Sequence, residues 1–343
     1  MTDLREIAHG VLFPVVTDLT LPEAIWAFLD HGGRALLFGE TGEEYATGRM
    51  SPQRVSAESA QRWREVTQAA TARAGTLIVA LDADVSAVHR LQAVAPPLPT
   101  LAQAESMSDQ DFETAVERVA RVARELGVNV FLSPTADVVA GANPWLSGRT
   151  LGRDPGTVSR LVRAYVRGCQ RGGVSATLKH FPGHPILTGV PAVDMDARVA
   201  LSRHELEPYL EPFAAGIAAG ARAVMMGPAI FDAYTPSVAA SVSPDLYRLL
   251  RSRLRFGGLV MTCDLDHRAT MRDAGLPQTA VRALQAGADL LLISPSGVPQ
   301  IPEIVAAIVT AIQAEQLSLE RLQAAWEAVR KLAHAPGSAH AHG

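Results

Sequence analysis

The feature that most constrains the fold is a series of eight short apolar runs separated by longer amphipathic segments. Each run is apolar at nearly every position, which is typical of strands covered on both faces, as in a parallel sheet. The segments between them place apolar residues three and four positions apart, which indicates helices packed against that sheet. The runs span 11–16, 35–39, 76–82, 128–134, 175–181, 223–227, 258–264 and 290–294.

Eight such β/α units in a chain of 343 residues predict a single α/β domain, a TIM-type (β/α)8 barrel, over residues 1–333. A doubly wound open sheet is the alternative, but the chain contains no GxGxxG or GK[ST] loop to support nucleotide binding. The last residues, 334–343, are small and polar, and we expect them to form a disordered tail.

Charge and cysteine content exclude several classes of function. The formal charge is −4, and no basic run with interleaved aromatic residues predicts a nucleic-acid groove. No apolar run approaches membrane-spanning length, so we expect a cytoplasmic protein without a membrane partner. Cys169 and Cys263 lie far apart without CxxC spacing, which excludes a disulfide framework and a cysteine-rich zinc site. We therefore expect a small-molecule ligand and no metal or cofactor, while the oligomeric state stays open.

The polar residues that end the predicted strands are the candidates for function, because barrel enzymes build their sites at the carboxyl ends of strands. A lone aspartate there most often caps the next helix, and a lone histidine is often a hydrogen-bonded core residue. Lys179 beside His180 is more specific, because a buried cation next to an imidazole needs a compensating ligand or carboxylate. The candidates are Asp82, Asp137, Lys179, His180, Cys263 and Asp264.

The hexapeptide "KHFPGH" at 179–184 resembles the signature of glycoside hydrolase family 3, especially its single-domain bacterial β-N-acetylhexosaminidases. The resemblance implies a barrel that acts on or binds an N-acetylhexosaminide or a related sugar. Four further segments resemble stretches of that family in the same order: "NVFLSPTADV", "NPWLSGRTLGRDP", "SVSPDLYRLLRSRLRFGGLVMTCDL" and "ALQAGADLLLIS".

The resemblance also implies which residues contact the sugar. Lys179 and His180 would hold its hydroxyls, with Arg149 and Asp82 as further contacts, because a guanidinium and a carboxylate suit vicinal hydroxyls. His184 has two interpretations that stay open: a catalytic group, or a hydrogen bonder that fixes its own loop.

The sequence departs from the family at the reacting centre. A gap-free alignment places Cys263 where the family carries its attacking carboxylate, and Asp264 one position later. Strand alternation would turn Asp264 to the opposite face unless a bulge intervenes. The loop after His184 is about five residues shorter than in the family and lacks its Asp-His acid/base pair, while Asp194 and Asp196 fall where they would cap the next helix.

Three functions remain compatible with these departures. The first is a divergent hydrolase with Asp264 or Asp266 as nucleophile and His184 or His267 as proton donor. The second is a repurposed barrel enzyme in which Cys263, as a thiolate of lowered pKa near Lys179 and His180, attacks a sugar-like substrate. The third is a sugar-binding protein without catalysis.

Overall fold

The eight predicted runs form the eight strands of one parallel sheet. The structure is a computed structural model in which residues 3–335 are described. The strands are β1 (Leu12–Val16), β2 (Ala35–Phe38), β3 (Ile78–Leu81), β4 (Val130–Phe131), β5 (Ser175–Phe181), β7 (Ala223–Met226), β10 (Leu259–Met261) and β11 (Leu291–Ile293).

The sheet closes into a barrel. Its strand order is β10-β7-β5-β4-β3-β2-β1-β11, with every neighbouring pair parallel. A parallel bridge between Met261 and Leu290 joins the two ends of this order. The predicted (β/α)8 barrel is therefore confirmed, and the doubly wound alternative is wrong.

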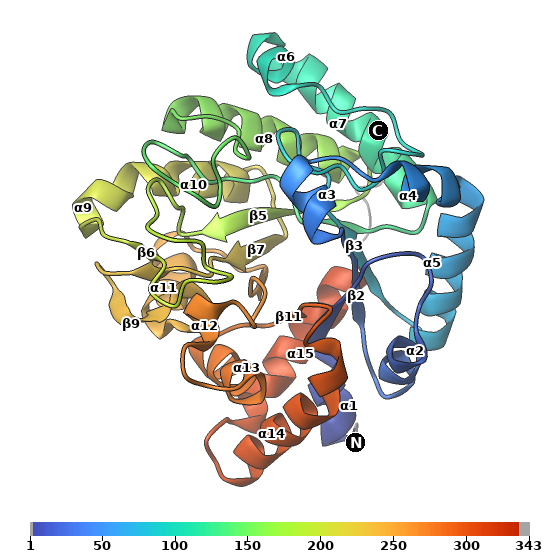
Figure 1. Ribbon diagram of the computed structural model, residues 1–343, viewed down its shortest axis with the longest axis vertical. Coiled ribbons are helices and arrows are strands. Elements are labelled where there is room, and N and C mark those ends of the chain that lie inside the picture. Colours follow the sequence, from blue (N-terminus) through green and yellow to red (C-terminus); the bar gives the residue numbers. More distant parts are fainter. Residues whose placement is uncertain (1–2, 336–343) are drawn as a thin grey trace, which may run out of the picture.

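Helices surround the barrel on all sides (Figure 1). The predicted helix after the third strand is observed as α7, which begins after Ser108, whose hydroxyl accepts a hydrogen bond from the backbone of Asp111. The chain leaves α7 through Gly127 at φ 87°, a left-handed conformation that favours glycine. The larger helices are α1 (Leu4–Gly10), α2 (Glu23–Asp30), α5 (Ala60–Ala74), α7 (Asp109–Glu125), α8 (Pro155–Arg171), α10 (Glu211–Ala218), α13 (Leu276–Ala286), α14 (Ile301–Gln313) and α15 (Leu319–Ala333).

Two apolar cores follow from the alternation of side chains along the strands. Residues such as Phe13, Ala80 and Met261 fill the barrel interior. Residues of the opposite phase, such as Val260, pack between the barrel and its helices. Cys263 belongs to the interior set, which places its side chain on the barrel axis side of the chain.

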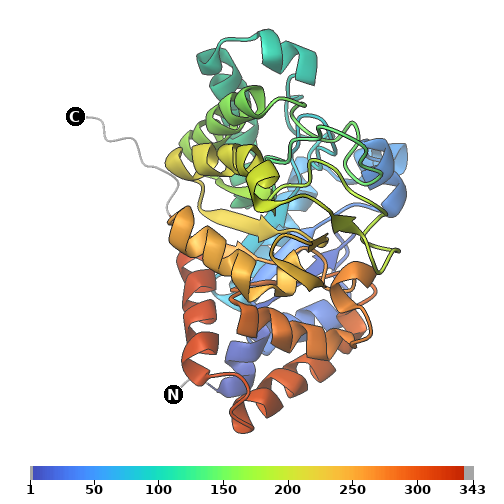
Figure 2. The ribbon, with the colours of Figure 1, turned by 90° about the vertical axis from the view of Figure 1, so that its left-hand side faces the viewer.

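Several additional small elements lie where the barrel strands end, on the right of Figure 2. The strands β6, β8 and β9 form a separate three-stranded sheet there. The small elements are α3 (Gly42–Thr47), α4 (Pro52–Ala57), α6 (Leu101–Ser106), β6 (Arg198–Val199), α9 (Arg203–Leu206), β8 (Ile230–Phe231), β9 (Thr235–Ala239), α11 (Pro244–Arg248) and α12 (Arg268–Met271).

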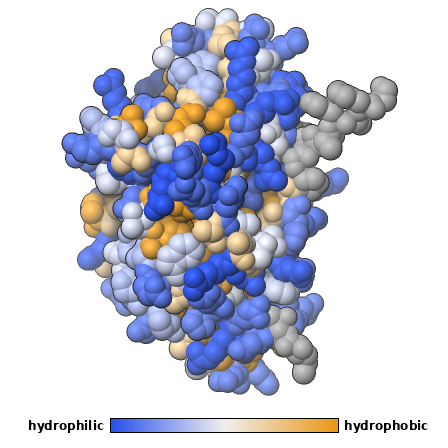
Figure 3. Space-filling view, turned by 90° about the vertical axis from the view of Figure 1, so that its right-hand side faces the viewer, coloured by the Kyte–Doolittle hydropathy of each residue, from blue (hydrophilic) through white to orange (hydrophobic). Residues whose placement is uncertain are grey.

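The outer face over α2, α4 and α5 is mainly hydrophilic, with smaller apolar areas between (Figure 3). This distribution is expected when each helix turns its apolar side toward the barrel. Within residues 3–335, no helix combines the length and apolar composition that crossing a bilayer requires. Of the predicted tail, His334 caps α15, whereas residues 336–343 lie outside the described residues.

Candidate functional site

A cavity of about 610 Å³ opens at the carboxyl ends of the barrel strands. Side chains from β2, β5 and the segments after β3 and β10 share its wall, as expected for a barrel site. A hollow of about 580 Å³ between α1, α2 and α14 lies away from these strand ends. The polar residues of the mouth cavity are Glu40, Thr41, Tyr45, Asp82, Trp145, Lys179, His180, Asp264, Asp266, His267, Ser294 and Ser296, and Cys263 lines it too.

Two carboxylates compensate the buried Lys179. Its ammonium group forms an ion pair with Asp82 and a second one, of 2.8 Å, with Asp84. Burial alone would lower the pKa of Lys179, but the charges of Asp82 and Asp84 raise it above its ordinary value. Burial raises the pKa of Asp82, against the effect of Lys179. The cavity floor thus holds a charged lysine together with hydrogen-bond acceptors.

Asp137 organises the turn that follows β5. Its Oδ2 accepts hydrogen bonds from the backbone N–H and Nδ1 of His180, each at 2.8 Å. Its Oδ1 accepts from the backbone N–H and Nδ1 of His184, at 2.9 and 2.8 Å. Burial would raise the pKa of Asp137, but the two histidines hold it well below its ordinary value. One fully buried carboxylate therefore fixes both histidines of the "KHFPGH" segment.

His180 faces the cavity as a neutral imidazole. Burial lowers its pKa to about 4, although the hydrogen bond to Asp137 opposes the shift. Because Nδ1 donates its proton to Asp137, Nε2 carries the lone pair. The ring packs against Trp145, with ring centroids 4.6 Å apart.

His184 lies behind this wall and is fully buried. It is not found among the described residues that line the cavity. Its Nε2 has no hydrogen-bond partner among residues 3–335, and Gly227 packs so closely that an added Cβ would lie 2.4 Å from Cε1. This position favours the loop-fixing interpretation of His184 over a role as proton donor.

Arg149 is also absent from the described lining of the cavity. Its guanidinium stacks on the ring of Tyr45, 3.9 Å from the centroid, and donates a hydrogen bond to the carbonyl of Trp145 at 3.0 Å. Tyr45 and Trp145 both line the cavity. In this structure Arg149 therefore supports the ring of Tyr45 and the backbone of Trp145, and its contact with a sugar stays a prediction.

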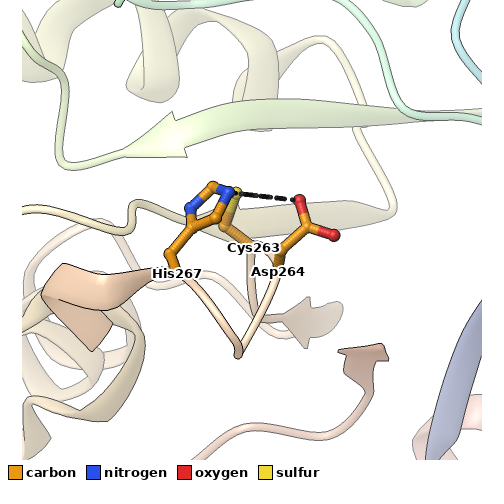
Figure 4. A group of neighbouring side chains, drawn as sticks. All are labelled: Cys263, Asp264 and His267. Atoms are coloured by element: carbon orange, nitrogen blue, oxygen red, sulfur yellow. Dashed lines mark hydrogen bonds and ion pairs between the residues drawn. The ribbon is translucent and has the colours of Figure 1, made fainter. Parts of the chain in front are cut away.

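Cys263 and Asp264 both line the cavity. Strand β10 ends at Met261, so the alternation that would turn Asp264 away no longer applies three residues later. Asp264 Oδ2 lies 3.7 Å from Nε2 of His267 and 4.0 Å from Sγ of Cys263 (Figure 4). Burial raises the pKa of Asp264, against the effect of His267.

The expected thiolate at Cys263 is a wrong prediction. Burial and the negative charge of Asp264 raise the pKa of this thiol well above its ordinary value, and Lys179 only partly opposes them. Lys179 is already paired with Asp82 and Asp84, so it cannot stabilise a thiolate strongly. The side chain is therefore a neutral thiol near pH 7.

Three other aspartates of the sequence analysis have structural roles. Asp266 accepts hydrogen bonds from the hydroxyls of Ser294 and Ser296. Asp194 accepts from the backbone of Val190 within a turn, and Asp196 pairs with arginines at 3.2 Å. Asp194 and Asp196 thus do not cap the next helix, contrary to the prediction, because a serine hydroxyl at residue 202 caps α9.

Glu40 is a cavity carboxylate that the sequence analysis missed. It follows β2 directly and lines the cavity, and its Oε1 is buried without a hydrogen-bond partner among residues 3–335. Burial and the charge of Asp82 raise the pKa of Glu40 well above its ordinary value, which favours its protonated form. Its signal was a glutamate at the end of the apolar run 35–39, the same signal that singled out Asp82.

The sequence analysis predicted no metal site, because the chain has no CxxC spacing, although several potential ligands lie within residues 263–267. The fold brings ligand atoms of Cys263, Asp264 and His267 within 4.8 Å of one another. Figure 4 shows the three side chains converging from one short segment.

Known proteins similar to this chain agree with this architecture. The β-hexosaminidase of Stenotrophomonas maltophilia (strain K279a) is 32% identical over 235 residues, which cover 66% of this chain and 67% of the relative. The β-hexosaminidase of Xylella fastidiosa (strain 9a5c) is 34% identical over 226 residues, which cover 63% of this chain and 67% of that relative.

Solved structures share the fold. A glycoside hydrolase family 3 β-N-acetylglucosaminidase from Paenibacillus sp. FPU-7 superposes with a TM-score of 0.87 at 24% identity, covering 100% of this chain and 65% of that one. A β-N-acetylhexosaminidase from Beutenbergia cavernae DSM 12333 superposes with a TM-score of 0.85 at 22% identity. The superposition covers 98% of this chain and 99% of the Beutenbergia protein. The chain thus spans about two thirds of the Paenibacillus protein and nearly all of the Beutenbergia one.

The family model that matches describes the glycosyl hydrolase family 3 N-terminal domain, and the match extends over residues 36–332. This range holds six of the eight barrel strands, all of β2 except Ala35, and every candidate residue of the cavity. The chain belongs to glycosyl hydrolase family 3.

Proposed function

We propose that the protein binds an N-acetylhexosaminide or a related sugar in the mouth cavity and hydrolyses it with Asp264 as nucleophile. The observation that carries this proposal is the shared cavity wall. It combines the Lys179, Asp82 and His180 floor with a carboxylate that follows β10.

The floor supports the sugar-binding part. The Lys179 ammonium donates hydrogen bonds, and Asp82 and the lone pair of His180 accept them, which matches the mixed character of sugar hydroxyls. Tyr45 and Trp145 add aromatic surface to the same wall. A sugar ring presents both hydroxyl groups and apolar C–H faces to such a site.

Asp264 and Glu40 support the hydrolytic part. The pKa of Glu40 is raised well above its ordinary value, whereas the pKa of Asp264 is raised against the effect of His267. Two carboxyl groups in different environments can divide the roles of acid and nucleophile. Asp264 would bond to the anomeric carbon while the leaving oxygen takes the proton of Glu40. Water, deprotonated by the Glu40 carboxylate, would then release the sugar from Asp264.

Glu40 thus replaces His184 and His267 as the proposed proton donor. Because the family's Asp-His loop is missing, we expect an ordinary aryl N-acetyl-β-glucosaminide to be hydrolysed very poorly. A cytoplasmic location remains a prediction from the sequence.

A covalent trap tests this proposal. An activated fluoro-sugar related to N-acetylglucosamine should leave a sugar ester on the enzyme, and peptide mass spectrometry should find it on Asp264. The Asp264→Asn variant should not be labelled but should still bind N-acetylglucosamine in calorimetry.

The other two functions predict different results. A label on Cys263 would support the repurposed thiol enzyme, although the raised pKa of that thiol argues against it. Saturable sugar binding without any label or turnover would support a sugar-binding protein without catalysis.

A further inference from the structure

We propose that Cys263, Asp264 and His267 form a binding site for a divalent metal ion of the zinc type, with its open position toward the mouth cavity. The metal site itself does not rest on the proposed hydrolysis, whereas its inhibitory role does.

The spacing of the three side chains fits a tetrahedral ion. Zinc bonds of about 2.0 Å to oxygen or nitrogen and about 2.3 Å to sulfur place the ligand atoms about 3.3–3.8 Å apart. Asp264 Oδ2 lies 3.7 Å from His267 Nε2 and 4.0 Å from Cys263 Sγ. All three ligand atoms lie within 4.8 Å of one another, so small side-chain rotations complete the geometry.

The backbone holds the three ligands in place before any ion binds. The N–H of Cys263 donates to the carbonyl of Met226 in β7 at 3.1 Å, and the N–H of Leu265 donates to Leu292 in β11 at 3.1 Å. His267 then begins α12 as its N-cap residue. The segment is therefore tied to both neighbouring strands, which lowers the ordering cost of metal binding.

The donor set selects among metal ions. A sulfur, an imidazole nitrogen and a single carboxylate oxygen suit Zn²⁺ or Co²⁺, whereas Mg²⁺ and Ca²⁺ prefer all-oxygen sites. Three protein ligands with a fourth position open are the arrangement of accessible zinc sites. The charge also favours a cation: Asp264 and Asp266 share this wall, while the ammonium of Lys179 is engaged by other carboxylates.

An ion at this position would occupy Oδ2 of Asp264, the carboxylate proposed to attack the sugar. Metal binding and hydrolysis would therefore exclude each other. The site would act as a reversible inhibitory site in the cavity wall.

The test is a titration of the full chain with Zn²⁺ and Co²⁺. His340 and His342 near the end of the chain can themselves bind these ions, so all proteins carry His340→Ala and His342→Ala. We expect one equivalent of Co²⁺ to produce a thiolate-to-cobalt absorption band in the near ultraviolet, and one equivalent of Zn²⁺ to remove it.

Matched variants locate the ion. Cys263→Ser, which keeps the side-chain size, should abolish the sulfur band, and His267→Ala should weaken binding at least tenfold. Cys169→Ser, in buried helix α8, should leave the band and the affinity unchanged. Melting curves identify variants that do not fold. If one of these ligand variants does not fold, Asp264→Asn tests the loss of a ligand in its place. A cobalt spectrum without the sulfur band, or equal affinity in Cys263→Ser and Cys169→Ser, would overturn the proposal.

The cobalt spectrum does not depend on enzymatic activity. The proposed metal site would therefore remain supported if the protein did not hydrolyse any sugar. If hydrolysis is observed, micromolar Zn²⁺ should suppress it, and a chelator should restore it. Unchanged activity at metal saturation would refute the inhibitory role.

Discussion

At the scale of single residues, Asp137 fixes the position of His180 in the cavity wall although it is not among the described residues that line the cavity. Its two oxygens accept four hydrogen bonds from two histidines. Each bond involves an ionised acceptor inside the barrel, where such bonds are stronger than neutral ones. The residue that aligns His180 with a ligand therefore lies one layer behind the cavity wall.

Replacing Asp137 with asparagine should destabilise the protein by about 2–4 kcal/mol, because an amide has one acceptor oxygen and no charge for four donors. Urea unfolding measures the change. The control is Asp154→Asn, at the exposed N-cap of α8, where the loss should stay below about 1 kcal/mol. Equal losses in both variants would contradict the proposed role of Asp137.

Replacing Glu40 with glutamine should lower kcat about 100- to 10,000-fold on any glycoside that the enzyme turns over, because general acid help contributes that much. Activity requires a protonated Glu40, so the wild-type rate should fall as pH rises through its raised pKa. The acidic limb should reflect Asp264, whose ionised form is lost as pH falls. A pH–rate profile of Glu40→Gln that keeps its alkaline limb would exclude Glu40 as the acid.

The sequence could supply the identities of most cavity residues but not their environments. Asp82, Lys179 and His180 line the cavity as the strand ends predicted. Glu40 follows an apolar run as Asp82 does, but the order of residues does not separate it from Glu43, which is exposed, or from Glu44, which is buried. The raised pKa of Cys263 depends on burial by distant segments, which residue order alone does not express.

At the scale of elements, packing between α7 and α8 depends on close approach. A Cβ added at Gly168 of α8 would lie 2.5 Å from the carbonyl oxygen of Glu113 and 2.8 Å from Cβ of Val116, both in α7. The backbone oxygen cannot rotate away. The two helices would have to separate, and α8 also covers β5, the strand that carries Lys179.

Gly168→Ala should therefore destabilise the protein by about 1–3 kcal/mol, the usual cost of overpacking, although alanine favours helix formation by about 1 kcal/mol. Thermal and urea unfolding measure the change. Gly42→Ala in α3 is the matched control, because no atom lies within 4 Å of its added Cβ. A stabilised Gly168→Ala protein would show that α7 and α8 can separate at little cost.

The apolar runs predicted all eight strands but overestimated their lengths. The run 258–264 yields only Leu259–Met261 as β10, and 128–134 yields only Val130–Phe131 as β4. The apolar runs continue past the last backbone hydrogen bond of each strand because the loop residues at the mouth of the barrel are also buried. This difference matters for function, since the early end of β10 lets Asp264 reach the cavity. In the small sheet, β6 and β8 have only two residues each, and β9 has a single buried residue and contains a proline, so none of the three forms an apolar run.

At the scale of the whole molecule, neutral buried histidines couple stability to pH. Burial lowers the pKa of His89 and of His180 from 6.5 to about 4. The unfolded chain binds more protons than the folded chain between these values, so stability is fully present above pH 6.5 and is lost as pH falls toward 4. A shift of this size corresponds to about 3 kcal/mol for each histidine.

We therefore expect the free energy of unfolding to decrease by a few kcal/mol between pH 6.5 and 4.5. Denaturant titrations at several pH values measure the slope. His89→Gln should reduce the slope without touching the Asp137 hydrogen bonds. A slope unchanged in His89→Gln and in His180→Gln would assign the pH dependence to other groups.

Barrel closure has a consequence for the order in which a nascent chain can fold. The last strand, β11, pairs with β1 and bridges to the residue that ends β10. Until Leu290 and Leu291 leave the ribosome, β1 and β10 are open edges with unpaired N–H and C=O groups, which invite pairing with other chains. The ring therefore cannot shut before β11 has been synthesised. A chaperone that shields those two edges during translation would protect the protein at its most aggregation-prone stage.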